Sequence, residues 1–123
     1  MNKVPKGKVK TYPDASGRSR HTSGGSDFEV LREAGFRVYA PPVNGPVGDR
    51  VNVVNGLFKP MLLRFPRLLV DPSCVVLIEA LEQQKRDKNG QPDKEHGHDH
   101  PVDALGYPCV YRYPLRQETK IAA

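Results

Sequence analysis

The chain has 123 residues, of which 37% are hydrophobic and 27% are charged, and its formal net charge is +5. This length suits one domain with a modest core and excludes a multidomain motor or a transporter. The charge surplus is local, because the first twenty residues hold six basic residues and one acid while the rest of the chain is balanced. Such a segment indicates either a polyanionic partner or a solvated basic tail.

No apolar run approaches the roughly 18 residues that a membrane span needs, and the polar N-terminus lacks the apolar core of a secretory signal. We therefore expect a soluble, unexported protein without a membrane partner. Cys74 and Cys109 lack the number and spacing of a disulfide scaffold or a CxxC zinc site, which predicts two reduced thiols. Twelve prolines and eleven glycines predict short elements with many breaks.

The first third of the chain predicts a strand, a helix and a second strand. Residues 1–7 are basic and contain proline and glycine, which predicts a flexible arm. Residues 8–12 alternate polar and β-favouring side chains and predict a strand, which the turn sequence at 13–17 ends. A serine or aspartate N-cap and a glycine stop predict a helix within 26–35, and 36–39 predicts the second strand.

The remainder of the chain predicts further helices and one more strand. In chain order these are a helix at 49–58, a strand at 67–70, a helix at 71–81, a mobile charged loop at 85–99, a helical segment at 102–107 that His100 and Pro101 open, and a tail at 113–123. This order predicts an α/β fold with a short, mostly parallel sheet flanked by helices.

Two aspartates stand where such a sheet places functional groups. Asp14 follows the first strand, and Asp103 lies about three residues into the last helix. Together, two carboxylates offer the oxygen ligands that Mg²⁺ or Mn²⁺ uses in phosphodiester cleavage. Structural roles are also open, since Asp14 suits a turn and Asp103 suits the start of a helix, where the helix dipole favours an acid.

Two further motifs carry possible chemistry. The tract His-Gly-His-Asp-His at 96–100, next to Glu95, predicts either a zinc site or a solvated loop, because alternate residues do not fix a tetrahedral geometry. The glycine-rich stretch at 22–26 precedes a helix and suits a phosphodiester backbone better than a nucleotide, since it lacks the P-loop Gly-Lys-Ser/Thr. The basic side chains expected to meet phosphates are Lys3, Lys6, Lys8, Lys10, Arg18 and Arg20.

Four separated segments are familiar in combination. They are Tyr-Pro-Asp-Ala-Ser-Gly at 12–17, Asp-Arg-Val-Asn-Val-Val-Asn at 49–55, the stretch from Leu-Val-Asp-Pro-Ser-Cys to Leu-Ile-Glu-Ala-Leu-Glu at 69–82, and His-Pro-Val-Asp-Ala-Leu-Gly-Tyr at 100–107. In this order they resemble the C-terminal nuclease domain of tailed-phage terminase large subunits. The resemblance spans roughly residues 8–112 and implies a partial RNase H-like α/β fold.

The resemblance also implies a function. In that family, acidic residues bind two divalent metal ions and cut the DNA concatemer during genome packaging. By position, Asp14 and Asp103 resemble two acids that would bind Mg²⁺ or Mn²⁺, and His100 resembles a histidine near a metal ligand or the scissile phosphate. The implied partners are double-stranded DNA and other terminase or portal subunits, in the host cytoplasm.

The departures from the family pattern leave more than one function open. Residues 1–13 contain no Asp or Glu, so the chain resembles the second portion of the domain, without its opening strands, its first catalytic Asp or the ATPase motor. Pro13 restricts Tyr12 and removes a backbone donor next to Asp14. We therefore expect either a metal-dependent endodeoxyribonuclease that the missing acid weakens in isolation, or a catalytically dead DNA-binding or packaging-assembly module. A histidine-loop metal protein unrelated to DNA is a third hypothesis.

Overall fold

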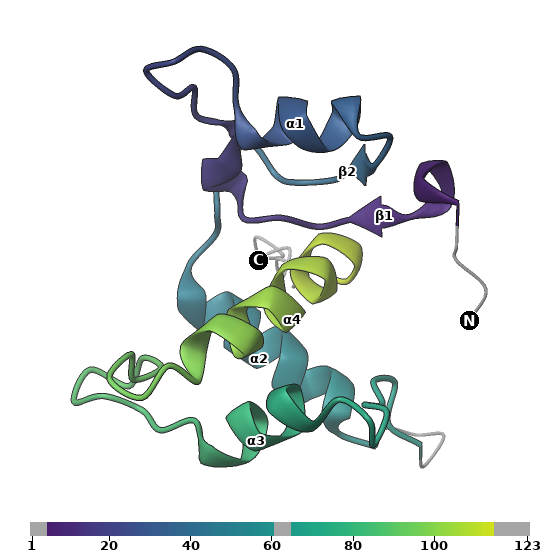
Figure 1. Ribbon diagram of the computed structural model, residues 1–123. Coiled ribbons are helices and arrows are strands. Elements are labelled where there is room, and N and C mark those ends of the chain that lie inside the picture. The colour runs from purple at the N-terminus through teal and green to yellow at the C-terminus, as the bar shows by residue number, and fades with distance from the viewer. Residues whose placement is uncertain (1–4, 61–64, 115–123) are drawn as a thin grey trace, which may run out of the picture.

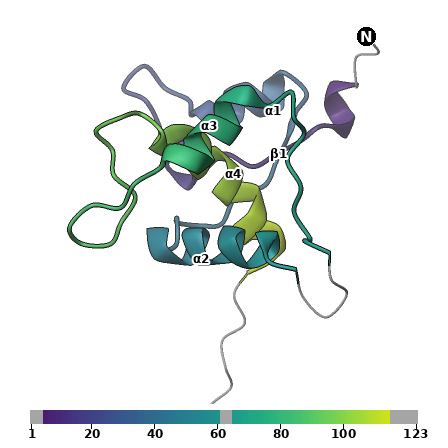
Figure 2. The same cartoon turned by 90° about the horizontal axis from the view of Figure 1, so that it is seen from below.

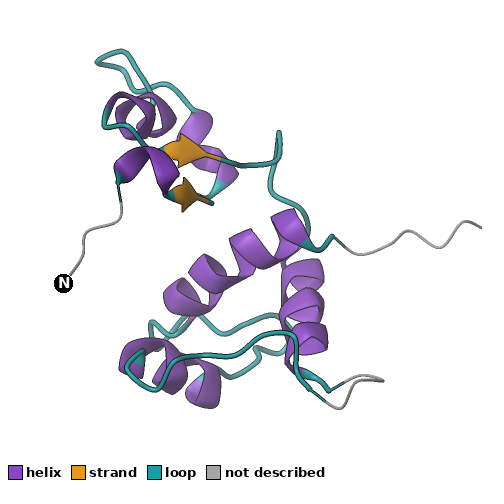
Figure 3. Cartoon of the chain, turned by 90° about the vertical axis from the view of Figure 1, so that its right-hand side faces the viewer, coloured by secondary structure: helices purple, strands orange, loops and turns teal. Residues whose placement is uncertain are grey.

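The structure is a computed structural model and describes residues 5–60 and 65–114 (Figure 1). In chain order its elements are the 3-10 turn η1 (Lys6–Lys8), strand β1 (Lys10–Thr11), the 3-10 turn η2 (Ala15–Arg18), helix α1 (Asp27–Glu33), strand β2 (Arg37–Val38), and helices α2 (Val47–Phe58), α3 (Val75–Gln83) and α4 (Asp99–Arg112). The two strands and α1 form one layer, and α2, α3 and α4 form the other (Figures 1 and 3).

The sheet layer is a parallel strand–helix–strand unit. Lys10 pairs with Arg37 in the register of β1 and β2, and α1 makes the connection between the two strands. A capping box between Ser26 and Glu29 starts α1, and Phe28 on its first turn is only 1% exposed. The predicted order of strand, helix and strand is confirmed, although both strands are shorter than their sequence patterns suggested.

The helical layer is organised around α4, which packs against both α2 and α3 (Figure 2). Its core is a buried cluster of Val53, Val54 and Leu57 from α2 with Cys109 from α4. The two layers meet at three tyrosine rings, with the Tyr111 centroid 5.6 Å from Tyr12 and 6.0 Å from Tyr39. This junction brings the end of β1 next to α4. None of the described helices is long and apolar enough to cross a membrane.

The strand predicted at 67–70 does not form, so the sheet of the described residues has two strands. The backbone N–H groups of Arg67 and Leu68 instead donate to the Leu57 carbonyl at 2.9 and 3.0 Å, where they satisfy the C-terminal end of α2. Leu69 is 79% exposed. The prediction was wrong because these two N–H groups bond to the end of α2 and are therefore not available to pair with a neighbouring strand.

The last helix is longer than the sequence predicted. It begins at Asp99 and continues through Pro108 to Arg112, so Asp103 lies in its second turn and not in its first. Pro108 has no N–H to donate to the carbonyl four residues earlier, which normally disfavours a helix interior. Gly106 precedes Pro108 and Cys109 follows it, and both are buried against α2. This packing holds the chain in a helical conformation through Pro108.

Candidate active site

One open cavity at the junction of the two layers collects the three candidate catalytic residues that the sequence suggested. Its volume is about 570 Å³, and its lining comes from the end of β1, the loop before α4 and one face of α4. Asp14, His100 and Asp103 all line it, although Asp14 comes from the opposite end of the chain. We call it the α4 cavity; its lining is Tyr12, Pro13, Asp14, Lys94, Asp99, His100, Asp103, Ala104 and Tyr107.

Three hydrogen bonds hold the carboxylate of Asp14. Oδ1 accepts from the Ser16 N–H at 2.8 Å and from the side-chain amide of Asn44. Oδ2 accepts from the Tyr107 hydroxyl at 3.0 Å. Asp14 is also the N-cap of η2, so it does form the turn that its sequence suggested while it lines the cavity. Its orientation is therefore fixed from both layers.

These hydrogen bonds set the charge of the cavity. Donation from Asn44 is the main reason that the pKa of Asp14 falls from 3.8 to about 2, although partial burial opposes the shift. Burial, followed by the bond to Asp14, raises the pKa of Tyr107 to about 12. At neutral pH the pair is thus an ionised carboxylate that accepts from a protonated phenol, and the cavity carries a fixed negative charge.

Asp103 faces a buried arginine on α2. The Nη2 of Arg50 lies 3.4 Å from Asp103 Oδ1, and the guanidinium lies 4.9 Å from the centroid of the Tyr107 ring. The side chain of Arg50 is 11% exposed and that of Asp103 is 28% exposed. The contact is long for a charged hydrogen bond, and the Arg50 Nε is buried without a partner among the described residues. Asp103 is therefore only loosely paired.

The sequence contained a signal for two cavity residues that its interpretation missed. Asp99, Asp103 and Tyr107 are spaced four residues apart, which places them on one face of a helix. The assignment of 85–99 to a loop hid this stripe. Arg50 and Asn44 carried no comparable signal, because each reaches the site from a different element through a tertiary contact.

The predicted phosphate-binding residues have unequal freedom in the structure. Lys8 and Lys10 are exposed, and Arg20 is 77% exposed at its side chain with Nη2 3.8 Å from Glu29 Oε1. The guanidinium of Arg18 instead donates to the backbone carbonyls of residues 40–42 and lies over the Phe28 ring. Lys3 and the side chain of Lys6 lie outside the described residues.

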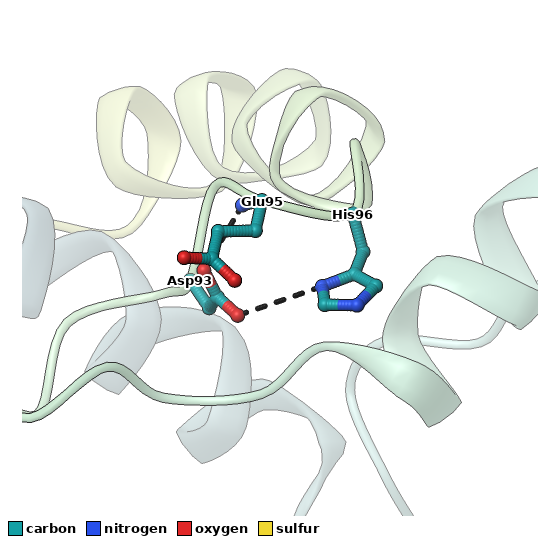
Figure 4. Close-up of side chains that lie close together, drawn as sticks. All are labelled: Asp93, Glu95 and His96. Carbon is teal, nitrogen blue, oxygen red and sulfur yellow. Dashed lines mark hydrogen bonds and ion pairs between the residues drawn. The ribbon is translucent and has the colours of Figure 1, made fainter.

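The histidine tract is divided between two places. Asp93, Glu95 and His96 have ligand atoms within 4.8 Å of one another, and we call this group the loop cluster (Figure 4). His96 Nδ1 lies 3.6 Å from Asp93 Oδ2, and the Glu95 N–H donates to Asp93 Oδ1 at 2.9 Å. His100 lies on α4 and lines the α4 cavity. The alternating histidines therefore do not converge on a single site.

Comparison with known proteins identifies one family. The model of the terminase RNaseH-like domain matches residues 3–111 of the chain. No curated protein and no solved structure matches it. The matched range includes the whole lining of the α4 cavity and the loop cluster.

Proposed function

The chain belongs to the terminase RNaseH-like domain family, and on that premise we propose that it is a metal-dependent endodeoxyribonuclease domain that cuts concatemeric viral DNA during genome packaging. The family match bears out the partial RNase H-like α/β fold that the resemblance implied. Its proposed substrate is double-stranded DNA, its proposed partners are other terminase or portal subunits, and its proposed setting is the host cytoplasm.

The observation that carries this proposal is that Asp14, His100 and Asp103 all line the α4 cavity. Carboxylate oxygens are the ligands that Mg²⁺ and Mn²⁺ prefer. The low pKa of Asp14 keeps it ionised at neutral pH, and the 3.4 Å contact with Arg50 leaves Asp103 loosely paired. The two side chains therefore have the chemistry to hold such an ion.

A divalent ion bound there would activate water and stabilise the leaving oxygen of a phosphodiester. The chain's own residues would prepare the site: Asn44 and Tyr107 orient Asp14, while Arg50 orients Asp103. His100 is exposed on the cavity lining, where its imidazole has access to a DNA phosphate or to a metal ligand. Exposed Lys8, Lys10 and Arg20 would attract the DNA backbone without sequence preference.

A second candidate function is a catalytically dead DNA-binding or packaging-assembly module. It is favoured by the fact that both oxygens of Asp14 already accept hydrogen bonds and Asp103 already faces a cation. Both carboxylates are thus partnered without a metal ion.

Cleavage of supercoiled plasmid with Mn²⁺ or Mg²⁺ separates the two functions. We expect nicking by the wild type, and at least about 100-fold slower nicking by Asp14→Asn and Asp103→Asn, because each removes a proposed ligand. Asp49→Asn is the control, since it makes the same charge change at an exposed residue in the first turn of α2. Salt-sensitive DNA binding by a wild type that cuts nothing would overturn the nuclease and support the dead module.

A further inference from the structure

The loop cluster has a use that the proposed nuclease does not explain. None of its three residues lines the α4 cavity, yet the ligand atoms of Asp93, Glu95 and His96 lie within 4.8 Å of one another. In Figure 4 the two carboxylates and the Nδ1 side of the imidazole face one another. The imidazole adds a nitrogen ligand to the two acids, so the group has the mixed ligand set of a transition metal.

The contact between His96 and Asp93 has the length expected of two ligands on one metal ion. Nδ1 of His96 lies 3.6 Å from Oδ2 of Asp93, which is too long for a hydrogen bond. Tetrahedral zinc, with bonds of about 2.0–2.2 Å, places two ligand atoms about 3.4 Å apart. A zinc ion between these two atoms therefore requires little movement of either side chain.

A buried acceptor without a partner lies next to the cluster. Asp93 and His96 line a cavity of about 280 Å³ between the end of α3 and the loop before α4, and Gln84 lines it as well. The Nε2 of Gln84 donates to the Asp93 carbonyl at 2.8 Å, which joins the cluster to the end of α3. The Gln84 Oε1 is buried and has no hydrogen-bond partner among the described residues. A polar ligand in this cavity, such as a metal-bound water, has the O–H that this oxygen lacks.

We propose that Asp93, Glu95 and His96 form a reversible Zn²⁺ site that is separate from the proposed nuclease centre. The imidazole favours Zn²⁺ over Mg²⁺ or Mn²⁺, which prefer oxygen ligands, and three protein ligands leave a fourth position for water. Binding is reversible because Glu95 and His96 are exposed, so ordering them around an ion costs conformational entropy. The inference goes beyond the proposed function and does not rest on it.

Zinc at this site would hold the segment between α3 and α4 in one conformation. Lys94 is exposed and stands between two of the proposed ligands, Asp93 and Glu95. Cleavage by trypsin after Lys94 needs this segment to open, and an ion that binds only the closed form lowers the open population. We therefore expect saturating Zn²⁺ to slow this cleavage by at least about threefold.

The test is Zn²⁺ binding to the untagged full chain, measured by calorimetry after a chelator has removed bound metal. Asp103→Asn serves as the background, so that the α4 cavity does not compete for the ion. We expect one Zn²⁺ per chain, and binding at least about tenfold weaker when His96→Ala or Glu95→Gln is added. The control is His21→Ala, which removes an exposed imidazole outside the loop cluster and is expected to leave Zn²⁺ affinity unchanged.

Two further measurements make the result specific to the loop cluster. Far-UV circular dichroism checks that each variant is folded, and trypsin digestion is expected to show protection of Lys94 by Zn²⁺ in the background protein and not with His96→Ala. Unchanged Zn²⁺ affinity in either folded variant, His96→Ala or Glu95→Gln, would overturn the site, as would a background protein that binds no Zn²⁺. Failure of the wild type to cut plasmid would overturn the proposed nuclease and leave the zinc site standing.

Discussion

The α4 cavity and the loop cluster offer similar chemical groups in different surroundings. Each contains carboxylates and an imidazole within one small region. The cavity takes them from both layers of the fold, whereas Asp93, Glu95 and His96 of the loop cluster come from one short segment. Glu95 and His96 are exposed, while Asp99 in the cavity is buried. The two places therefore differ in how the surrounding structure holds the side chains, and not in which ligand atoms are present.

Support from other elements is what distinguishes the two. In the α4 cavity, Asn44 and Tyr107 hold Asp14 from distant parts of the chain. In the loop cluster, the carboxylate of Asp93 contacts Glu95 and His96, which a local turn already brings near, and the backbone of Asp93 bonds to Gln84 and Lys85 just after α3. Ordering exposed side chains around an ion costs conformational entropy, so we expect the cavity, where Asp14 is already held in place, to bind a metal ion more tightly. This expectation holds even though, in the described part of the chain, the loop cluster is the group that has three ligand atoms within 4.8 Å of one another.

Arg50→Met should have the largest effect on stability. It leaves Asp103 unpaired in the partly buried cavity and removes the contact with the Tyr107 ring, so we expect the free energy of unfolding to fall by about 2–3 kcal/mol. Urea denaturation measures the change. Arg86→Met is the matched control in the exposed loop, where Arg86 donates to the Gly90 carbonyl, and it should cost less than about 0.5 kcal/mol. If the two variants lost the same unfolding free energy, the α4 cavity would be no better supported than the exposed loop.

Gly17→Ala tests the support beneath Asp14. A Cβ at this residue would lie 2.7 Å from Cε1 of Phe28, which is 1% exposed and has no room to move. We expect a loss of about 1–3 kcal/mol in the free energy of unfolding. Gly97→Ala in the loop meets no atom within 4 Å but has φ +72°, so it should cost about 1 kcal/mol. A larger loss in Gly97→Ala, by the same measurement, would contradict the comparison.

The pKa of Asp14 predicts a pH dependence of stability. Because folding lowers this pKa from 3.8 to about 2, the stabilisation is fully present above about pH 4 and is lost as the pH falls through 2. We expect the difference in unfolding free energy between wild type and Asp14→Asn to shrink by about 1–2 kcal/mol between pH 5 and pH 2. A difference that stays constant with pH would mean that the hydrogen bonds to Asp14 do not stabilise its ionised form.

Tyr107→Phe removes one donor to Asp14 and keeps the ring. The pKa of Asp14 should rise, stability should fall by about 1 kcal/mol, and Mn²⁺ affinity should fall by about tenfold, because a carboxylate ligand loses an orienting partner. Tyr113→Phe, at a tyrosine that is 52% exposed, is the control for loss of a hydroxyl. Unchanged Mn²⁺ affinity in Tyr107→Phe would show that this hydrogen bond does not position Asp14.

His96→Ala should have the smallest effect. Since none of the three loop-cluster residues lines the α4 cavity, we expect plasmid cleavage within about twofold of wild type and a stability change below about 0.5 kcal/mol. Loss of plasmid cleavage in this variant would show that the loop cluster is part of the active site. Binding of Zn²⁺ as tightly to the loop cluster as Mn²⁺ to the cavity would refute the argument from preorganisation.

Local signals predicted some elements well. The helix at α1 could be recognised from the capping box of Ser26 with Glu29 and from the stop at Gly35, which adopts φ +91°. These interactions lie within a few residues of each other, so the sequence contains them completely. The segment 67–70 had a strand pattern, but a distant carbonyl on Leu57 accepts its backbone N–H groups. No local pattern contains that contact.

For this protein, the sequence by itself determined the kinds and order of the elements apart from the segment 67–70, the family resemblance and the aspartates worth testing. Tertiary structure decided which groups meet. It extended α4 through Pro108, divided the histidine tract, and placed Arg50 against Asp103 and Asn44 against Asp14. The reason is physical: propensities and caps act over a few residues, whereas burial and orientation of a side chain depend on packing between elements that are far apart in the chain.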